Sequence, residues 1–128
     1  MHQLGHVLSA RHDLAHGATL SIIMPAWMKC LYNTRIESYV QFADRIFGIE
    51  IGKRSKEAAA IEGIERFEEF LKDINVPTRL SEVNVKADEI DDLTDDVVRI
   101  SFSADGKLNS RPPVDRESVR KVFETALN

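Results

Sequence analysis

The sequence predicts an all-α fold, a bundle of about six helices in a single domain. Apolar residues recur along most of the chain with the 3.6-residue period of an amphipathic helix. No segment combines sustained apolar–polar alternation with β-branched residues, which is the pattern of a half-buried strand. The chain has 128 residues and a mass of 14.5 kDa, enough for one domain that buries a core without disulfides.

The first two predicted helices differ in how their apolar residues are arranged. Residues 2–12 carry two leucines four positions apart, and this helix is expected to end near Asp13. Residues 18–32 are apolar on nearly every side, which is typical of a helix that is buried all round. Pro25 lies inside this second helix and is expected to kink it or to leave a carbonyl without its partner.

The third and fourth helices have recognisable ends. The third is predicted to begin at a capping box of Thr34 and Glu37 and to end at Gly48. The fourth is predicted over residues 56–75, with Ser55 as its N-cap. Two ion pairs are expected on its outer face, Glu62–Arg66 and Glu68–Lys72.

After a short connection, the fifth helix is predicted over residues 87–100. Residues 101–114 contain glycine and prolines and are expected to form a long loop. Asp115 is the predicted N-cap of the last helix. Val114 and Val119 are placed to form a hydrophobic staple across its start.

Charge and composition exclude several classes of protein. The net charge of −4 argues against nucleic acid as the main partner. No apolar stretch is long enough to cross a bilayer, and no secretory signal is recognisable, so no membrane partner is predicted. The single cysteine, Cys30, excludes an intrachain disulfide and fits a reducing compartment, so a cytoplasmic location is expected.

The acidic residues are concentrated in one segment. Between Glu82 and Asp96 there are seven acids and one base, Lys86. The segment lacks the alternating acids and the glycine of a calcium-binding EF-hand loop. A solvated helix face is therefore predicted, favoured by the helix dipole near an N-terminus.

All four histidines lie in the first sixteen residues. His2 and His6 are four positions apart, as are His12 and His16, so on a helix each pair shares a face that could bind a metal. Ordinary surface histidines are the alternative, and the spacing leaves both open. The sequence has no His-Glu-x-x-His motif, so a zincin-type protease is not supported. The only acid nearby is Asp13, so the histidines are interpreted as part of a site that is completed elsewhere.

Residues 2–28 resemble the iron-containing (group III) alcohol dehydrogenase family, and within it the butanol dehydrogenases and NADP-dependent aldehyde reductases. The family signature has a His, another His four residues later, and a His-Gly pair fourteen residues after the first. The sequence matches it at His2, His6 and His16. Residues 109–112, Asn-Ser-Arg-Pro, resemble the family's Asn-Pro-Arg segment, from which the serine departs.

The resemblance implies that this chain corresponds to the C-terminal helical part of such an enzyme, without its dinucleotide-binding domain. It implies that His2 and His16 are two ligands of a divalent metal, iron or zinc, whose Asp and third His ligands lie upstream. It also implies that His6 handles protons near the nicotinamide of NAD(P), and that His12 lies near the cofactor and substrate. The complete enzyme would interconvert a small-molecule aldehyde and a primary alcohol.

Two imidazoles without a carboxylate leave a metal ion under-coordinated. The chain alone is therefore expected to bind metal weakly or not at all and to show no measurable dehydrogenase turnover. The alternative is a non-catalytic helical module whose apolar surface forms a homo-oligomer or binds a partner. An N-terminal dinucleotide-binding half is the partner that the resemblance implies.

Overall fold

The computed structural model describes residues 1–104, 106–108 and 113–128 of the chain. Within these residues it contains six α-helices and three short 3₁₀ helices, so the predicted all-α fold with about six helices is confirmed. The α-helices are α1 (His2–His12), α2 (His16–Leu31), α3 (Ile36–Phe47), α4 (Lys56–Asp73), α5 (Ile90–Ser101) and α6 (Arg116–Leu127). The 3₁₀ helices are η1 (Tyr32–Arg35), η2 (Leu80–Val83) and η3 (Ala87–Glu89).

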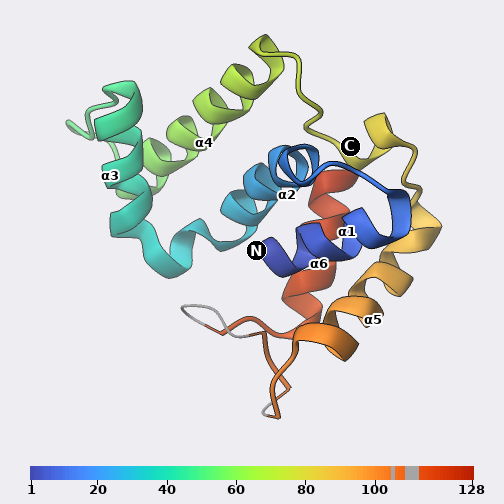
Figure 1. Ribbon diagram of the computed structural model, residues 1–128. Helices are drawn as coiled ribbons and strands as arrows, with labels where there is room; N and C mark the ends of the chain where they lie inside the picture. Colours follow the sequence, from blue (N-terminus) through green and yellow to red (C-terminus); the bar gives the residue numbers. More distant parts are fainter. Residues whose placement is uncertain (105, 109–112) are drawn as a thin grey trace.

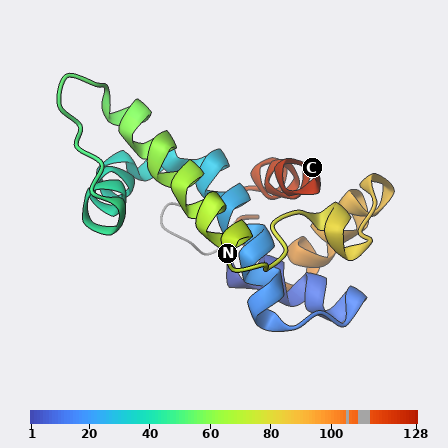
Figure 2. The same cartoon turned by 90° about the horizontal axis from the view of Figure 1, so that it is seen from above.

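Helices α1, α2, α5 and α6 form one packed body, from which α3 and α4 extend as a hairpin (Figure 1). α2 has the central position, because it contacts α1, α4 and α6. The view from above shows α4 lying across α2 (Figure 2). The largest fully buried side chains of the main core include Leu4, Leu8, Ile22, Ile23, Leu93 and Phe123. The predicted burial of the second helix on most of its sides therefore follows from its central place.

Three of the predicted helix ends are confirmed. The Ser55 hydroxyl accepts a hydrogen bond from the backbone N–H of Ala58 at 3.1 Å, and the Asp115 carboxylate accepts one from Ser118 at 2.9 Å. Gly48 ends α3 with a φ of 67°, a left-handed conformation that glycine adopts without steric cost.

The predicted capping box at the start of the third helix is wrong. Thr34 lies inside η1, and its hydroxyl donates to the carbonyl of Leu31 at 2.7 Å instead of capping α3. The Glu37 side chain pairs with Lys56 of α4. The chain leaves α2 through a tight 3₁₀ turn, so α3 begins at Ile36, one residue later than a cap at Thr34 requires.

α2 begins at His16, earlier than the expected residue 18, and continues through the buried Pro25. After α5 the chain returns to the body at Leu108, whose backbone pairs with Phe102 and Val114 as isolated bridges. Val114 and Val119 are both buried in the main core, as the predicted staple requires. The Asn-Ser-Arg-Pro segment lies outside the described residues. Among the helices that are described, none is long and apolar enough to cross a lipid bilayer.

The expected Glu68–Lys72 pair is also wrong, because Glu68 points inward. Its side chain contacts Lys29 Nζ of α2 at 2.6 Å and Arg79 at 3.8 Å, and the residue is only 8% exposed. Arg79 also donates to the carbonyl of Asn128 at 3.0 Å. Glu68 thus connects α4 to α2 and to the segment that leads into η2. The Glu62–Arg66 pair is confirmed at 3.7 Å.

We predict that Glu68→Gln lowers the free energy of unfolding by about 2 kcal/mol, because it leaves Lys29 near a largely buried neutral amide. The exposed neighbour Glu69 is the control, and Glu69→Gln should change it by less than about 0.5 kcal/mol. Urea denaturation followed by circular dichroism measures both. Equal effects of the two substitutions would show that Glu68 does not connect α4 to α2.

Candidate functional site

Three exposed imidazoles meet where α1 passes the start of α2. His2 and His6 lie on successive turns of α1, and His16 is the first residue of α2. The ring centres of His2 and His16 are 5.5 Å apart and the rings are nearly parallel, with 23° between their planes. The rings of His6 and His16 are 5.4 Å apart and tilted by 36°. The structure thus brings together three of the four residues that the sequence singled out.

A close approach of α1 and α2 sets this arrangement. A Cβ atom on the buried Gly5 would lie 2.9 Å from the Thr19 hydroxyl oxygen, closer than real Cβ contacts allow. Thr19 is fully buried, and its hydroxyl donates to the carbonyl of His16 at 2.7 Å. Gly5 lies between His2 and His6 on α1, so the same contact that joins the helices positions all three imidazoles.

The short turn between the helices is fixed by local hydrogen bonds. Asp13 ends α1 in the left-handed conformation with a φ of 52°, and its N–H donates to the carbonyl of Ser9. The Ser9 hydroxyl donates to the carbonyl of Leu14 at 2.7 Å. This turn brings His16 back to α1, so Asp13 acts here as a turn residue.

The spacing of two of these rings is compatible with two ligands of one metal ion. Two imidazoles that share a tetrahedral ion have ring centres about 5 Å apart, since each ligating nitrogen lies about 2.1 Å from the ion. The spacing of His2 and His16 is close to this value. However, in the part of the chain that the structure describes, no three His, Cys, Asp or Glu side chains form a group able to hold an ion. A carboxylate or a further imidazole has to come from elsewhere.

His12 lies away from the other three imidazoles. Ten residues along an α-helix turn the side-chain direction by about 80° from that of His2. The Nε2 atom of His12 lies 2.8 Å from a carboxylate oxygen of Glu89 in η3, and the adjacent Arg11 pairs with Asp96 of α5. Both contacts hold the end of α1 against the η3–α5 segment. The expected contact of His12 with a cofactor stays a prediction.

The two carboxylates that bind the end of α1 have lowered pKa values. The pKa of Glu89 is lowered mainly by the backbone N–H of Lys86, which donates to it at 2.8 Å, and further by His12. The pKa of Asp96 is lowered mainly by its hydrogen bond from Arg11.

The predicted solvated acidic face is confirmed, since Asp88, Asp92 and Asp95 are all exposed. Asp95 also pairs with Arg116 of α6 at 2.7 Å, and the neighbouring Asp91 pairs with Arg120 at 2.8 Å. Acids of α5 thus bind arginines of α6, an arrangement that neither the charge count nor the helical period indicates.

An apolar groove begins beside His16. Its volume is about 250 Å³, and it runs between α2 and the end of α4. The side chains that line it are almost wholly apolar and include Leu20, Met24, Phe67, Leu71 and Ile74. A Cβ atom on the exposed Gly17 would meet nothing within 4 Å, so the groove is open at the histidine end.

Comparisons with known proteins agree in one family. The family described as "Fe-containing alcohol dehydrogenase family, C-terminal" matches residues 1–127. The NADH-dependent butanol dehydrogenase A of Clostridium acetobutylicum is 29% identical over 124 residues, which are 96% of this chain and 31% of that protein. The chain therefore spans about a third of the length of such relatives.

Two solved structures carry the same fold. The NADH-dependent butanol dehydrogenase A of Thermotoga maritima is 32% identical and superposes with a TM-score of 0.85, over 99% of this chain and 32% of that one. The aldehyde reductase YqhD of Escherichia coli, in a substrate- and cofactor-free form, is 27% identical, with a TM-score of 0.86 over 98% and 32% of the two chains.

We predict that Gly5→Ala destabilises the protein by about 1–2 kcal/mol. The added methyl group overpacks the contact with Thr19, and the free energy that this costs exceeds the free energy gained from the higher helix propensity of alanine. The same change should cost less in a Thr19→Ala background, where the clashing oxygen is absent. Gly17→Ala is the control, and it should be neutral or stabilising because its Cβ meets open space. Thermal unfolding of the four variants measures this, and identical costs of Gly5→Ala in both backgrounds would contradict the close approach.

Acid should loosen the attachment of α1. A carboxylate whose pKa is lowered by folding stabilises the protein at any pH above the ordinary pKa of that group. This stabilisation is lost as the pH falls through the lowered pKa of the folded state. The temperature of unfolding should therefore decrease when the pH is lowered below about 4, and this decrease should be smaller in Asp96→Asn. The exposed Asp88 is the control, since Asp88→Asn should keep the full drop. If Asp96→Asn also keeps it, the pair with Arg11 does not contribute.

Proposed function

The chain belongs to the C-terminal family of Fe-containing alcohol dehydrogenases, and from this premise we propose that it supplies one wall of a metal- and NAD(P)-dependent site. The reaction at this site is the interconversion of an aldehyde and a primary alcohol. One observation carries the proposal, namely the meeting of the His2, His6 and His16 rings on an exposed face.

The proposed roles of the imidazoles follow the family resemblance, because the spacings of His2 and His6 from His16, 5.5 and 5.4 Å, are nearly equal. His2 and His16 hold a divalent ion, iron or zinc, for which neutral imidazole nitrogens are suitable ligands. His6 lies beside His16 and does not need to be a ligand. An imidazole can accept and donate a proton near neutral pH, so His6 serves the alcohol oxygen as a proton donor and acceptor. His12 is the weaker assignment, because its Nε2 is already bonded to Glu89.

A divalent ion held by His2 and His16 would supply Lewis-acid polarisation of the substrate oxygen, and bound NAD(P) would supply the hydride chemistry. The work of this chain is to orient two ligating nitrogens and a proton-handling imidazole on a rigid helix pair. The remaining ligands and the nucleotide-binding surface come from a part of the enzyme that corresponds to the other two thirds of the relatives. We infer that this part covers the histidine face and the groove beside it.

On its own the chain should bind metal weakly, since two imidazoles supply neither enough donors nor a neutralising carboxylate. The open apolar groove favours a second candidate function, in which copies of the chain associate through this surface. Sedimentation of the isolated chain distinguishes the two candidates. A chain that only completes the site of an enzyme is expected to sediment as a monomer, and a self-associating module as a dimer or larger oligomer.

A chimera tests the proposal directly. In it, this chain replaces the corresponding third of the Thermotoga maritima butanol dehydrogenase A. We expect the chimera to retain about one metal ion per chain and to reduce butyraldehyde with NADH. His16→Ala should lose most of the bound metal and reduce kcat/KM at least 100-fold, because a first ligand is missing. His6→Ala should keep the metal and lower kcat.

The control is Gln41→Ala, an exposed position on α3 far along the chain from the histidines. Metal content by mass spectrometry and aldehyde reduction should be unchanged by it. A folded chimera whose His16→Ala variant retains full metal and activity would refute the assignment. In the isolated chain, stoichiometric metal after dialysis, lost in His16→Ala, would refute the expectation that this wall is incomplete.

A further inference from the structure

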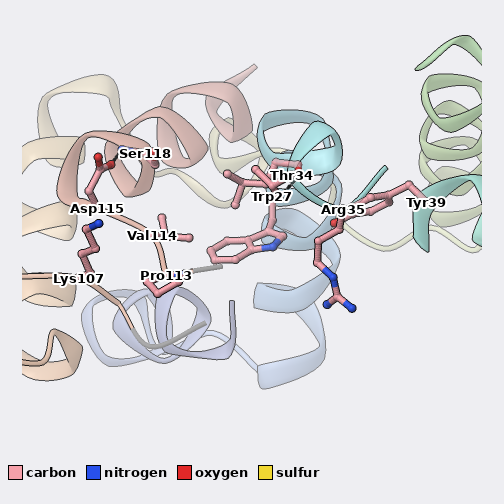
Figure 3. Close-up of a pocket in the computed structure, with 10 residues that line it drawn as sticks. Trp27, Thr34, Arg35, Tyr39, Lys107, Pro113, Val114, Asp115 and Ser118 are labelled. Atoms are coloured by element: carbon pink, nitrogen blue, oxygen red, sulfur yellow. Dashed lines mark hydrogen bonds between the residues drawn. The ribbon is translucent and has the colours of Figure 1, made fainter. Parts of the chain in front are cut away.

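A second cavity lies at the other end of α2 from the histidines. Its volume is about 200 Å³, and it is lined by the end of α2, by η1, by α3 and by the start of α6. The residues that matter for its chemistry are Trp27, Arg35, Tyr39, Lys107, Asp115 and Ser118. In Figure 3 the indole ring of Trp27 lies between Pro113 and Val114 on one side and Arg35 and Tyr39 on the other.

The Trp27 end of this cavity presents hydrogen-bond donors that are not used elsewhere. Over the described residues, the structure gives no hydrogen bond or ion pair to the guanidinium of Arg35, the indole N–H of Trp27 or the hydroxyl of Tyr39. Arg35 and Tyr39 are close enough to interact electrostatically. An arginine has five N–H donors and no acceptor, so it can be satisfied only by an acceptor from water or from a ligand.

The opposite end of the cavity carries a carboxylate, Asp115, which is already hydrogen-bonded. The Asp115 carboxylate accepts the Ser118 N–H that caps α6, and Lys107 acts on the same carboxylate. These contacts lower the pKa of Asp115, so the group is ionised at neutral pH. At the Trp27 end, the charged group is the guanidinium of Arg35, which determines what that end attracts.

We propose that this cavity binds a small organic oxyanion, a carboxylate or a phosphate monoester carried on a planar body. The oxyanion lies against Arg35 and the Tyr39 hydroxyl, and the planar body lies on the Trp27 ring. A guanidinium binds carboxylate and phosphate oxygens through paired N–H donors. An indole face provides a large flat contact for an aromatic ring, and its N–H a further donor. The volume limits the ligand to a single ring with its anionic group.

Trp27 is the only tryptophan in the chain, so its fluorescence reports on this cavity alone. The probes are phenyl phosphate, benzoate and inorganic phosphate, titrated at constant ionic strength. Phenyl phosphate and benzoate are expected to change the emission saturably, with Kd values in the millimolar range or below. The tighter of the two identifies which oxyanion the site prefers. Inorganic phosphate should bind at least tenfold more weakly, since it cannot stack on the indole.

Substitutions separate a built site from general charge attraction. Arg35→Gln should weaken phenyl phosphate binding at least tenfold, and Tyr39→Phe about threefold. The control is Arg45→Gln, which removes the same charge from an exposed position on α3 and should leave the affinity unchanged. Circular dichroism verifies that each variant is folded.

Three results would overturn the proposal. The first is the lack of any saturable response to phenyl phosphate or benzoate in the unaltered chain. The second is equal affinity in Arg35→Gln and the unaltered chain, and the third is an equal loss in Arg45→Gln. Inorganic phosphate binding as tightly as phenyl phosphate would contradict the contact with Trp27. None of these results depends on metal binding or on alcohol dehydrogenase activity.

Discussion

The candidate site depends on one steric constraint, the close approach of α1 and α2 at Gly5 and Thr19. No side chain larger than hydrogen fits on α1 at this point without displacing the fully buried threonine. Thr19 in turn bonds to the carbonyl of His16, so the α2 end of the histidine cluster is fixed from inside the core. The backbone positions of the exposed imidazoles are therefore fixed by a buried contact between two helices. A site built on rigid helices needs less ordering when a ligand binds than a site built on flexible segments.

The C-terminal end of α1 is held by charged side-chain contacts instead of close packing. Arg11 and His12 bind carboxylates of the η3–α5 segment, and these contacts are partly exposed and screened by solvent. The contact of Gly5 with Thr19 involves no ionisable group, whereas the carboxylates that bind the other end lose their charge in acid.

The sequence was sufficient for those features that arise from local rules. Helix periodicity and the Ser55 and Asp115 caps are encoded within a few residues, and the structure confirms them. The i,i+4 spacing of His2 and His6 places both residues on α1, and their role in a site stays a prediction. The spacing alone could not show that His16 approaches His2 across a turn. The sequence leaves the buried position of α4 open between Phe67 and Glu68, and an acid is ordinarily expected to face solvent. Glu68 is nevertheless buried, because it lies four residues after Ile64 and three before Leu71. Cavities formed by several elements, such as the one around Trp27, have no linear signature.

The two candidate sites share α2 and differ in what they attract. Trp27 follows His16 by eleven residues, a separation of about 16 Å along the helix axis. A small ligand bound at one site therefore cannot touch the other, and the buried middle of α2 lies between them. The imidazole nitrogens at the first turn of α2 are suited to a cation, whereas the donors of Trp27, of Arg35 in η1 and of Tyr39 in α3 are suited to an anion. Any influence of one site on the other would have to pass through the packing of α2, whose contacts with α1, α4 and α6 leave a rigid helix little freedom to shift.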